Sequence, residues 1–397
     1  MFFKIKTFAI ILLLSLSGWF GWKGYLYFFD TKTPILTFSG LQNNNFYSGD
    51  IQCSLAVNKP GQMSVLLDEK TLINNFKLSS SQESPFTIPT QTIANGKHEL
   101  TINFTDNTFH KNKASKNYQF FVDNTPLKAA FVQKQNNLKV LQGRTLHLQF
   151  QVNKKIKTAK IKTLSKTYDA FPEMENSCIY EAFIPTDCEE NPNEYLISIE
   201  LQDKVGNSLS LENKFQIIAS PFKKEILNIK QSKILAEREQ GKDPSIFEEK
   251  MESLTKNSPH QKMWRGKFCA PINITRTSCE FGSTRITQHK GKYIHKAVDI
   301  LSLPKSVVWA PQSGVIVLKD RFEHSGNTVV IDHGYGILSM YFHLDDFANI
   351  NVGKKISQGN PIGYLGKTGH ATGYHLHWEL RINNTAVDPM QWIKSNF

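Results

Sequence analysis

The sequence predicts a mainly β protein of several domains, with an apolar segment at its N-terminus and one helical segment inside the chain. The 397 residues are enough for two to four domains. Short runs that alternate apolar and polar residues recur about every ten residues between positions 31 and 220, and glycine-punctuated runs return from 263 onward. A hydrophobic content of 40% and a charged content of 21% fit a folded chain and not a disordered one.

Residues 1–30 predict a membrane anchor or an export signal. Lys4 and Lys6 precede an uncharged apolar run from Phe8 to Trp22. A run of about 15 residues is within the range of a signal-peptide core and short for a transmembrane span. Tryptophan and tyrosine residues follow it, as at a membrane interface, where a cleaved signal would have small residues. We therefore expect an uncleaved anchor in the inner membrane and not a cleaved signal. The body would lie in the cell envelope, on the periplasmic or extracellular side.

Residues 31–124 and 125–220 predict two tandem β-sandwiches. Turn signals such as NKPG, ANGK and KVGN separate their alternating runs. The segments GKHELTINFTDNTFHKNKASKNYQFFV and NEYLISIELQDKVGNSLSLENKFQII share one order of strand, Asp-bearing turn and final strand, which indicates an internal repeat. The pair resembles the tandem immunoglobulin-like modules of bacterial surface proteins. This resemblance concerns architecture and assigns no site.

Residues 221–262 predict a helical connector. KKEILNIKQSKILAEREQ and PSIFEEKMESLTK have helical spacing of their apolar residues, many charges and few β-branched clusters. Asp243-Pro244-Ser245 would begin the second helix of the connector.

Five cysteines fit an exported body. Cys178 and Cys188 lie close together in the sequence, as do Cys269 and Cys279, and Cys53 is left over. Each pair could close a short loop in an oxidising compartment, and buried thiols are the alternative. No Cys-x-x-Cys knuckle supports a zinc–thiolate site.

A surplus of positive charge bears on the partners. Lysine and arginine number 47 against 35 acidic residues, for a formal net charge of +12. Such a balance favours anionic surfaces, among them nucleic acid, phospholipid and cell-envelope polymers. The sequence contains no stripe of basic residues interleaved with aromatic ones, so we expect no nucleic-acid partner.

Three stretches near the C-terminus carry candidate metal ligands. YIHKAVDIL contains His295 and Asp299, MYFHLDD contains His343, and GYHLHWEL contains His375 and His377. Residues i and i+2 of a strand point to one face, so the last two imidazoles can converge. A catalytic zinc site has three protein ligands plus a water, which His295, Asp299 and one histidine of the final pair could supply. Taken singly, the first pair could be solvated loop residues and His343 a satisfied core histidine.

Six segments of this region follow one another in a familiar order: FGSTR, HKAVDI, VVWAPQSGVIV, GNTVVIDHGYGILSMYFHL, GKKISQGNPIGYLGKTGHATGYHLHWELR and VDPMQWI. Residues 263–393 resemble the lysostaphin/LytM-type zinc metallopeptidases, which cut peptide crosslinks of peptidoglycan. The resemblance implies a small antiparallel β domain, expected at 263–397, with a groove over the metal.

The resemblance also implies roles for individual residues. By position in the motifs, His295, Asp299 and His377 would bind one Zn²⁺ per chain. His343 and His375 would flank the metal-bound water as catalytic groups.

Two positions depart from the family pattern. Ala297 stands where the family usually has glycine, and Tyr374 where it usually has proline. Neither change removes a ligand. His333 matches a turn of the family and is expected to be structural. Three further histidines are expected to be solvated or at the rim: His289, His324 and His370.

We expect a zinc-dependent endopeptidase that hydrolyses peptide crosslinks of peptidoglycan. One alternative is a catalytically silent domain that binds and activates a separate wall amidase, although such domains usually lack the metal ligands and carry a long coiled coil. Another is an envelope adhesion protein whose metal site is structural, although such a site should be closed by four ligands. The sandwiches could bind envelope partners.

Overall fold

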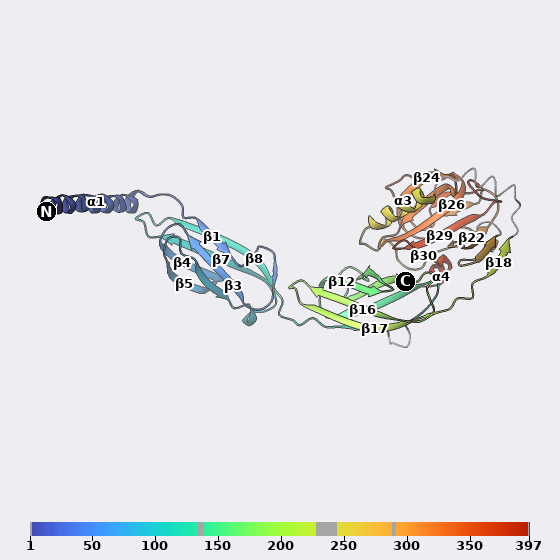
Figure 1. The fold of residues 1–397 in the computed structure, drawn as a ribbon, viewed down its shortest axis with the longest axis horizontal. Coiled ribbons are helices and arrows are strands. Elements are labelled where there is room, and N and C mark those ends of the chain that lie inside the picture. Colours follow the sequence, from blue (N-terminus) through green and yellow to red (C-terminus); the bar gives the residue numbers. More distant parts are fainter. Residues whose placement is uncertain (1, 134–137, 228–243, 288–290, 396) are drawn as a thin grey trace. The chain divides into compact units, whose positions relative to one another are not determined.

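The computed structural model describes residues 2–133, 138–227, 244–287, 291–395 and 397 (Figure 1). For some of these residues, 2–14 among them, only the backbone is described. The chain divides into two compact units. The first unit comprises Met1–Leu127 with Asp203–Asn207, and the second comprises Lys128–Gln202 with Ser208–Phe397.

Helix α1 (Phe2–Phe29) covers most of the N-terminal segment and exposes aromatic side chains such as Trp19 and Trp22 in its C-terminal half. In the part of the chain that the structure describes, no helix is both long and apolar enough to cross a membrane. The membrane anchor expected at residues 1–30 is therefore not supported. The side chains of residues 2–14, which hold much of its apolar run, lie outside the described part.

The first unit contains a two-sheet β-sandwich. Its elements are β1 (Leu36–Ser39), β2 (Phe46–Tyr47), β3 (Ile51–Val57), β4 (Gly61–Leu67), β5 (Lys70–Leu78), β6 (Ser84–Ile88), η1 (Thr90–Thr92), β7 (Gly96–Asp106) and β8 (Lys113–Val122). The sheets have the orders β1-β3-β6 and β2-β8-β7-β4-β5. Alternate residues of β3 and β4 are buried, as the period of two requires. Leu55 and Ile102 come from different sheets, yet both are fully buried in one apolar cluster.

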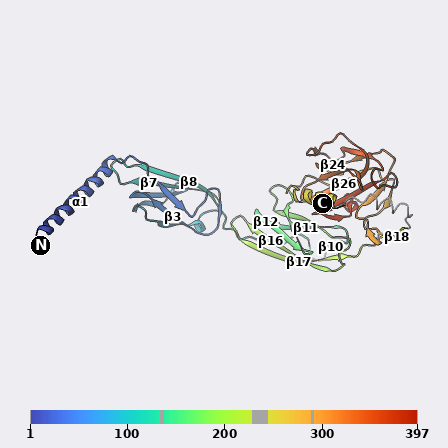
Figure 2. The same cartoon turned by 45° about the horizontal axis from the view of Figure 1, so that its top comes forward.

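The second unit begins with another pair of sheets. Its strands are β9 (Ala129–Phe131), β10 (Lys139–Leu141), β11 (Thr145–Val152), β12 (Ile156–Thr163), β13 (Lys166–Asp169), β14 (Phe171–Pro172), β15 (Ile179–Pro185), β16 (Glu194–Asp203) and β17 (Ser208–Ile218). The sheet orders are β10-β17-β16-β12-β13 and β14-β15-β11-β9. Figure 2 shows β16 and β17 side by side, and they pair antiparallel. The mainly β prediction is confirmed, and the immunoglobulin-like assignment stays a prediction.

The connector differs from the expected helix pair. Residues Lys224–Leu227 form strand β18, which pairs in parallel with β20 (Thr284–Thr287), and β21 (Gly291–Ile294) follows β20 in the same sheet. The prediction of a first helix is wrong at 224–227. Pairing with β20, which is distant in the sequence, overrides the helical spacing of this segment. Residues 228–243 lie outside the described part. The second helix, α3 (Pro244–Lys256), begins where it was predicted.

The C-terminal domain (residues 263–397) is built on one ten-stranded sheet. Its elements are β19 (Arg276–Cys279), β22 (Val298–Leu301), β23 (Val307–Trp309), β24 (Gly314–Phe322), β25 (Gly326–Asp332), β26 (Ile337–Phe347), β27 (Lys355–Ile356), β28 (Pro361–Leu365), β29 (Leu376–Ile382), β30 (Thr385–Val387) and α4 (Pro389–Lys394). The main path runs β19-β22-β29-β26-β25-β24-β27. Strands β26 and β29 lie at its centre and are buried almost throughout. Helix α3 packs on this sheet, where its fully buried Met251 joins Leu338 and Met340 of β26 in one cluster.

The second sandwich packs against the C-terminal domain within the second unit. Strand β15 is buried on both faces from Tyr180 onward, because one face meets its own sandwich and the other meets β29 and β30. Phe183 of β15 contacts Trp264 and Trp392 with ring centroids 5.6 and 5.5 Å away. The Gln391 side chain accepts from the Thr145 amide at 2.8 Å and donates to its carbonyl at 2.9 Å. These contacts join the two parts through apolar packing and hydrogen bonds between a side chain and the backbone.

Candidate metal centre

A row of paired residues crosses the central sheet at the candidate site. Asp299 of β22 lies opposite Cys279 of β19 on one side and opposite His377 of β29 on the other. His377 in turn lies opposite Phe342 of β26. Directly paired residues of neighbouring strands point to the same face of a sheet. The pairing therefore brings Asp299 and His377 together across 78 residues of sequence, as the prediction requires.

Two imidazole nitrogens lie close to the Asp299 carboxylate. The Asp299 Oδ1 atom lies 3.1 Å from His295 Nε2 and 2.9 Å from His377 Nδ1. Two ligand atoms bound to one tetrahedral zinc lie roughly 3.3 Å apart, given metal–ligand distances near 2 Å. His295 Nε2 is buried and makes no hydrogen bond, despite its nearness to the carboxylate. A buried nitrogen lone pair beside a carboxylate and a second imidazole fits a divalent cation, so the residues present suit zinc.

The charge states of these groups also suit metal binding. Burial opposes ionisation of Asp299, but the imidazoles of His295 and His377 outweigh it and hold the pKa of Asp299 well below its usual value. Burial lowers the pKa of His295, although the Asp299 carboxylate partly opposes this shift. Metal ligands must be deprotonated, and an ionised carboxylate with a neutral imidazole is the form that binds.

The two predicted catalytic histidines lie beside the convergent donors. The ring centroid of His343 is 4.8 Å from that of His375 and 6.0 Å from that of His377. His375 Nε2 lies 3.9 Å from Asp299 Oδ1. His375 immediately precedes β29 and is not part of it, so its position depends on the approaching loop as well as on the strand.

Hydrogen bonds to carbonyl groups orient both rings. His343 Nδ1 donates to the Thr368 carbonyl at 2.8 Å, and His375 Nδ1 donates to the Gly373 carbonyl at 2.9 Å. Each neutral ring then presents Nε2 as an acceptor. Burial, reinforced by the neighbouring histidines, lowers the pKa of His343 to about 3. His343 also has a backbone φ of +63°, a strained conformation of the kind found at functional sites.

An ionic chain missed by the sequence analysis continues behind His377. Glu379 Oε2 lies 4.0 Å from His377 Nε2, and Arg381 Nε donates to Glu379 Oε1 at 2.6 Å. Arg381 also donates from Nη2 to Glu248 of α3 at 2.9 Å. His377, Glu379 and Arg381 are two residues apart along β29, so they lie on one face of the strand. The period of two could have indicated this ionic chain from the sequence.

The structure also places the positions that depart from the family pattern and the other histidines. Ala297 is fully buried and is not among the residues with positive φ, so its backbone does not require glycine. His333 is fully buried, and its nitrogens lie 2.7 Å from the Ser313 carbonyl and 2.8 Å from Ser339 Oγ, which suits a structural role. His289 lies outside the described residues.

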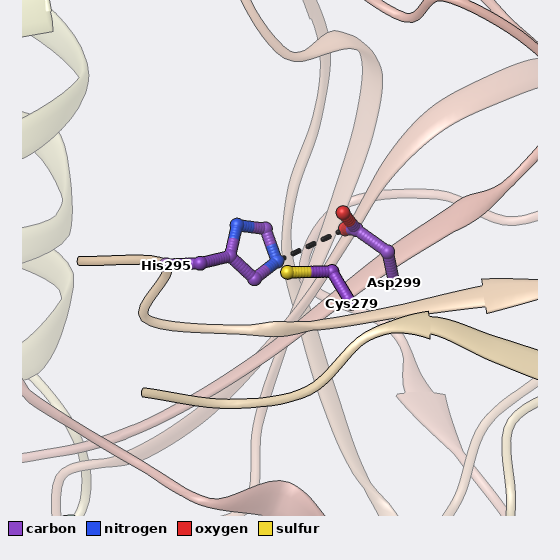
Figure 3. Close-up of side chains that lie close together, drawn as sticks. All are labelled: Cys279, His295 and Asp299. Atoms are coloured by element: carbon purple, nitrogen blue, oxygen red, sulfur yellow. Dashed lines mark ion pairs between the residues drawn. The ribbon is translucent and has the colours of Figure 1, made fainter. Parts of the chain in front are cut away.

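Cys279 is a further group at the site that the sequence analysis did not assign there. One ligand atom each from Cys279, His295 and Asp299 lie within 4.8 Å of one another (Figure 3). Among the described residues, which include all five cysteines, no disulfide is present. The two cysteine pairs considered from the sequence therefore do not close loops in this structure.

A cavity of about 400 Å³ opens elsewhere, between the second sandwich, α3 and the turn that joins β29 to β30. Tyr168, Tyr335 and Asn384 are among its lining residues. It contains none of the five predicted site residues, so we assign the chemistry to the histidine cluster and not to this cavity.

Comparisons with known proteins match the same part of the chain. A family model described as Peptidase family M23 matches residues 293–389, which include all five predicted site residues. The DD-carboxypeptidase/endopeptidase Mpg of Neisseria meningitidis serogroup B is 35% identical over 120 residues, which are 30% of this chain and 27% of the relative. The peptidoglycan DD-endopeptidase ShyC of Vibrio cholerae is 31% identical over 121 residues, 30% of this chain and 28% of the relative.

A further relative has a different description. The murein hydrolase activator EnvC of Escherichia coli is 30% identical over 106 residues, which are 27% of this chain and 25% of the relative. The chain thus spans about a quarter of the length of these curated relatives. The resemblance inferred from the motifs is confirmed for the C-terminal domain: residues 293–389 form a domain of Peptidase family M23.

Proposed function

We propose that the C-terminal domain is a zinc-dependent endopeptidase that hydrolyses peptide crosslinks of peptidoglycan. The observation that carries the proposal is the convergence of His295, Asp299 and His377, with His343 and His375 beside them. A structural zinc site has no use for two additional imidazoles, whereas amide hydrolysis needs groups that handle protons. The peptidoglycan DD-endopeptidase description of the ShyC relative supports the substrate class.

His295 Nε2, Asp299 Oδ1 and His377 Nδ1 would hold the ion. A zinc ion bound there supplies Lewis acidity, which polarises a scissile carbonyl and makes a nearby water more acidic. Three protein ligands leave a place for water, as hydrolysis requires.

The two flanking histidines would handle the protons. The Nδ1–H of His343 is held by the Thr368 carbonyl, so Nε2 can accept a hydrogen bond from the attacking water and then its proton. His375 lies beside Asp299, where its ring in the protonated form can donate to the oxyanion of the tetrahedral state. The carbonyl contacts that orient both rings reduce the reorganisation needed during the reaction.

The basic charge and the sandwiches support a place in the cell envelope. A formal net charge of +12 favours association with anionic wall polymers. The two sandwiches could space the peptidase from its attachment or bind envelope partners. Retention of the N-terminal segment as an anchor stays a prediction from its sequence alone. N-terminal sequencing of the mature protein tests it, and a mature start beyond Tyr27 would reject it.

Digestion of purified peptidoglycan tests the proposed activity. The zinc-loaded full-length protein should release peptide fragments that mass spectrometry identifies as products of crosslink cleavage. The His377→Ala variant and the chelator-treated protein should release none. Intact peptidoglycan after incubation with fully zinc-loaded protein would contradict the proposal.

A second candidate function is activation of a separate wall amidase, which the match to the murein hydrolase activator favours. Such a domain needs no metal ligands, whereas here nitrogens of both His295 and His377 lie within 3.1 Å of Asp299 Oδ1. If this candidate were right, the protein would not cleave peptidoglycan alone. It would accelerate a wall amidase equally well as wild type and as His377→Ala.

A further inference from the structure

We propose that Cys279 is a fourth metal-ligating residue of this centre. The inference rests on the proposed zinc site and adds a protein ligand that competes with water for the open position. Cys279 lies outside the segment that matches Peptidase family M23, which begins at residue 293.

The sheet register places Cys279 at the centre. Strand β19 is antiparallel to β22, and the register shifts between Thr277 and Cys279. Without this irregularity Ser278 would lie opposite Asp299, but the shift puts Cys279 there. Cys279 thereby joins Asp299 and His377 in one row on one face of the sheet.

The distances are close to those of a ligand set. One ligand atom each from Cys279, His295 and Asp299 lie within 4.8 Å of one another. Sulfur and nitrogen atoms bound to one tetrahedral zinc lie about 3.5 Å apart. His377 is not one of these three residues, so side chains would have to move to close a four-ligand site.

A second observation concerns the space between Cys279 and Asp299. His295 Nε2 is buried and makes no hydrogen bond, and the His295 side chain is 10% exposed. In Figure 3 the Cys279 sulfur and the His295 nitrogen both point toward the space beside the Asp299 carboxylate. A bound cation would satisfy this buried nitrogen. The thiol contacts the Glu280 carbonyl at 3.7 Å.

Ligation by Cys279 has a consequence for the reaction. His295, Asp299, His377 and Cys279 would supply four protein ligands, and four protein ligands close a tetrahedral zinc site. With all four in place no position would remain for water, so Cys279 would have to leave the ion before hydrolysis could proceed. Cys279 ligation would hold the resting protein in a closed form.

Cobalt spectroscopy tests the proposal directly. The full-length protein, stripped of metal and kept reduced, is loaded with one equivalent of Co²⁺, and its near-ultraviolet absorption and bound cobalt are measured. The wild type should show a thiolate-to-cobalt charge-transfer band. Cys279→Ser and Cys279→Ala should lose the band yet still bind one cobalt through the remaining ligands. Cys269→Ser is the matched control in the same domain, because its half-buried thiol lies 3.9 Å from the Ala310 carbonyl and outside the ligand cluster, and it should keep the band.

The outcomes separate this inference from the proposed function. If the wild type binds one cobalt without a thiolate band, or if Cys279→Ser keeps the band, Cys279 is not a ligand while the zinc site stands. If the wild type binds no cobalt and no zinc, the metal centre is absent and both proposals fail. A wild-type spectrum without the band rejects Cys279 as a ligand even if the Cys279 variants do not fold.

Discussion

Replacing Arg381 by methionine should destabilise the C-terminal domain by about 3–5 kcal/mol, because it leaves a buried carboxylate without its partner. Arg381 is 8% exposed and Glu379 is 5% exposed, and the two side chains share a 2.6 Å hydrogen bond. Methionine keeps most of the apolar stem of arginine, so the loss falls mainly on the charge of Glu379. Removing the charge of Glu248, the partner of Arg381 on α3, should reduce stability far less. The Glu248 side chain is 51% exposed, and Glu248→Gln should change stability by about 0–1 kcal/mol.

Urea unfolding followed by tryptophan fluorescence measures this difference. Four of the six tryptophans lie in the C-terminal domain, at positions 264, 309, 378 and 392. The double variant Arg381→Met with Glu379→Gln should be more stable than Arg381→Met alone, because the amide carries no charge to leave unpaired. The reasoning is wrong if Arg381→Met unfolds within about 1 kcal/mol of wild type, or if the double variant is less stable than the single one.

Three further predictions concern other parts of the second unit. Burial disfavours the charge of Glu181, but hydrogen bonds from His147 and Lys262 outweigh the effect of burial and lower the pKa of Glu181 below the usual 4.5. The ionised Glu181 therefore contributes fully to stability above pH 4.5, and this contribution is lost as the pH falls through the lowered pKa. Wild type should lose stability below that pH more steeply than Glu181→Gln, and parallel pH curves would contradict this. Replacing His343 or His375 by alanine should lower turnover on peptidoglycan by about 10²–10⁴-fold while zinc stays bound. Zinc loss on changing His343, or near-normal turnover, would reject that division of roles. Phe183→Ala should destabilise the contact between the second sandwich and the C-terminal domain by about 3–5 kcal/mol, measured by urea unfolding, because Phe183 is 5% exposed and lies among aromatic rings. A change below about 1 kcal/mol would show that the contact contributes little.

The sequence predicted the mainly β fold and the residues that converge at the site. The spacing of His375 and His377 indicated a shared strand face, and the motif order paired them with His295 and Asp299. The structure starts β29 one residue after His375, so the two rings are held by different means. Strand alternation is a local property, which is why it could be read from the sequence at all.

The errors arise where distant partners decide local structure. The segment at 224–227 has helical spacing, yet it forms β18 because β20 offers backbone hydrogen bonds. The position of Cys279 depends on a register shift, which no spacing of residue types reveals. Glu248 reaches Arg381 from α3 across 133 residues, and only the packing of the helix on the sheet creates that contact.

The zinc content of purified protein tests the central claim most directly. The full-length wild type should hold one tightly bound zinc, and the double variant His377→Ala with Cys279→Ser should hold none, because only His295 and Asp299 remain as donors. His324→Ala is the control, since this exposed histidine contacts His370 and belongs to no ligand set described here. It should keep one zinc. One tightly bound zinc in the double variant His377→Ala with Cys279→Ser would contradict the assignment of the metal centre.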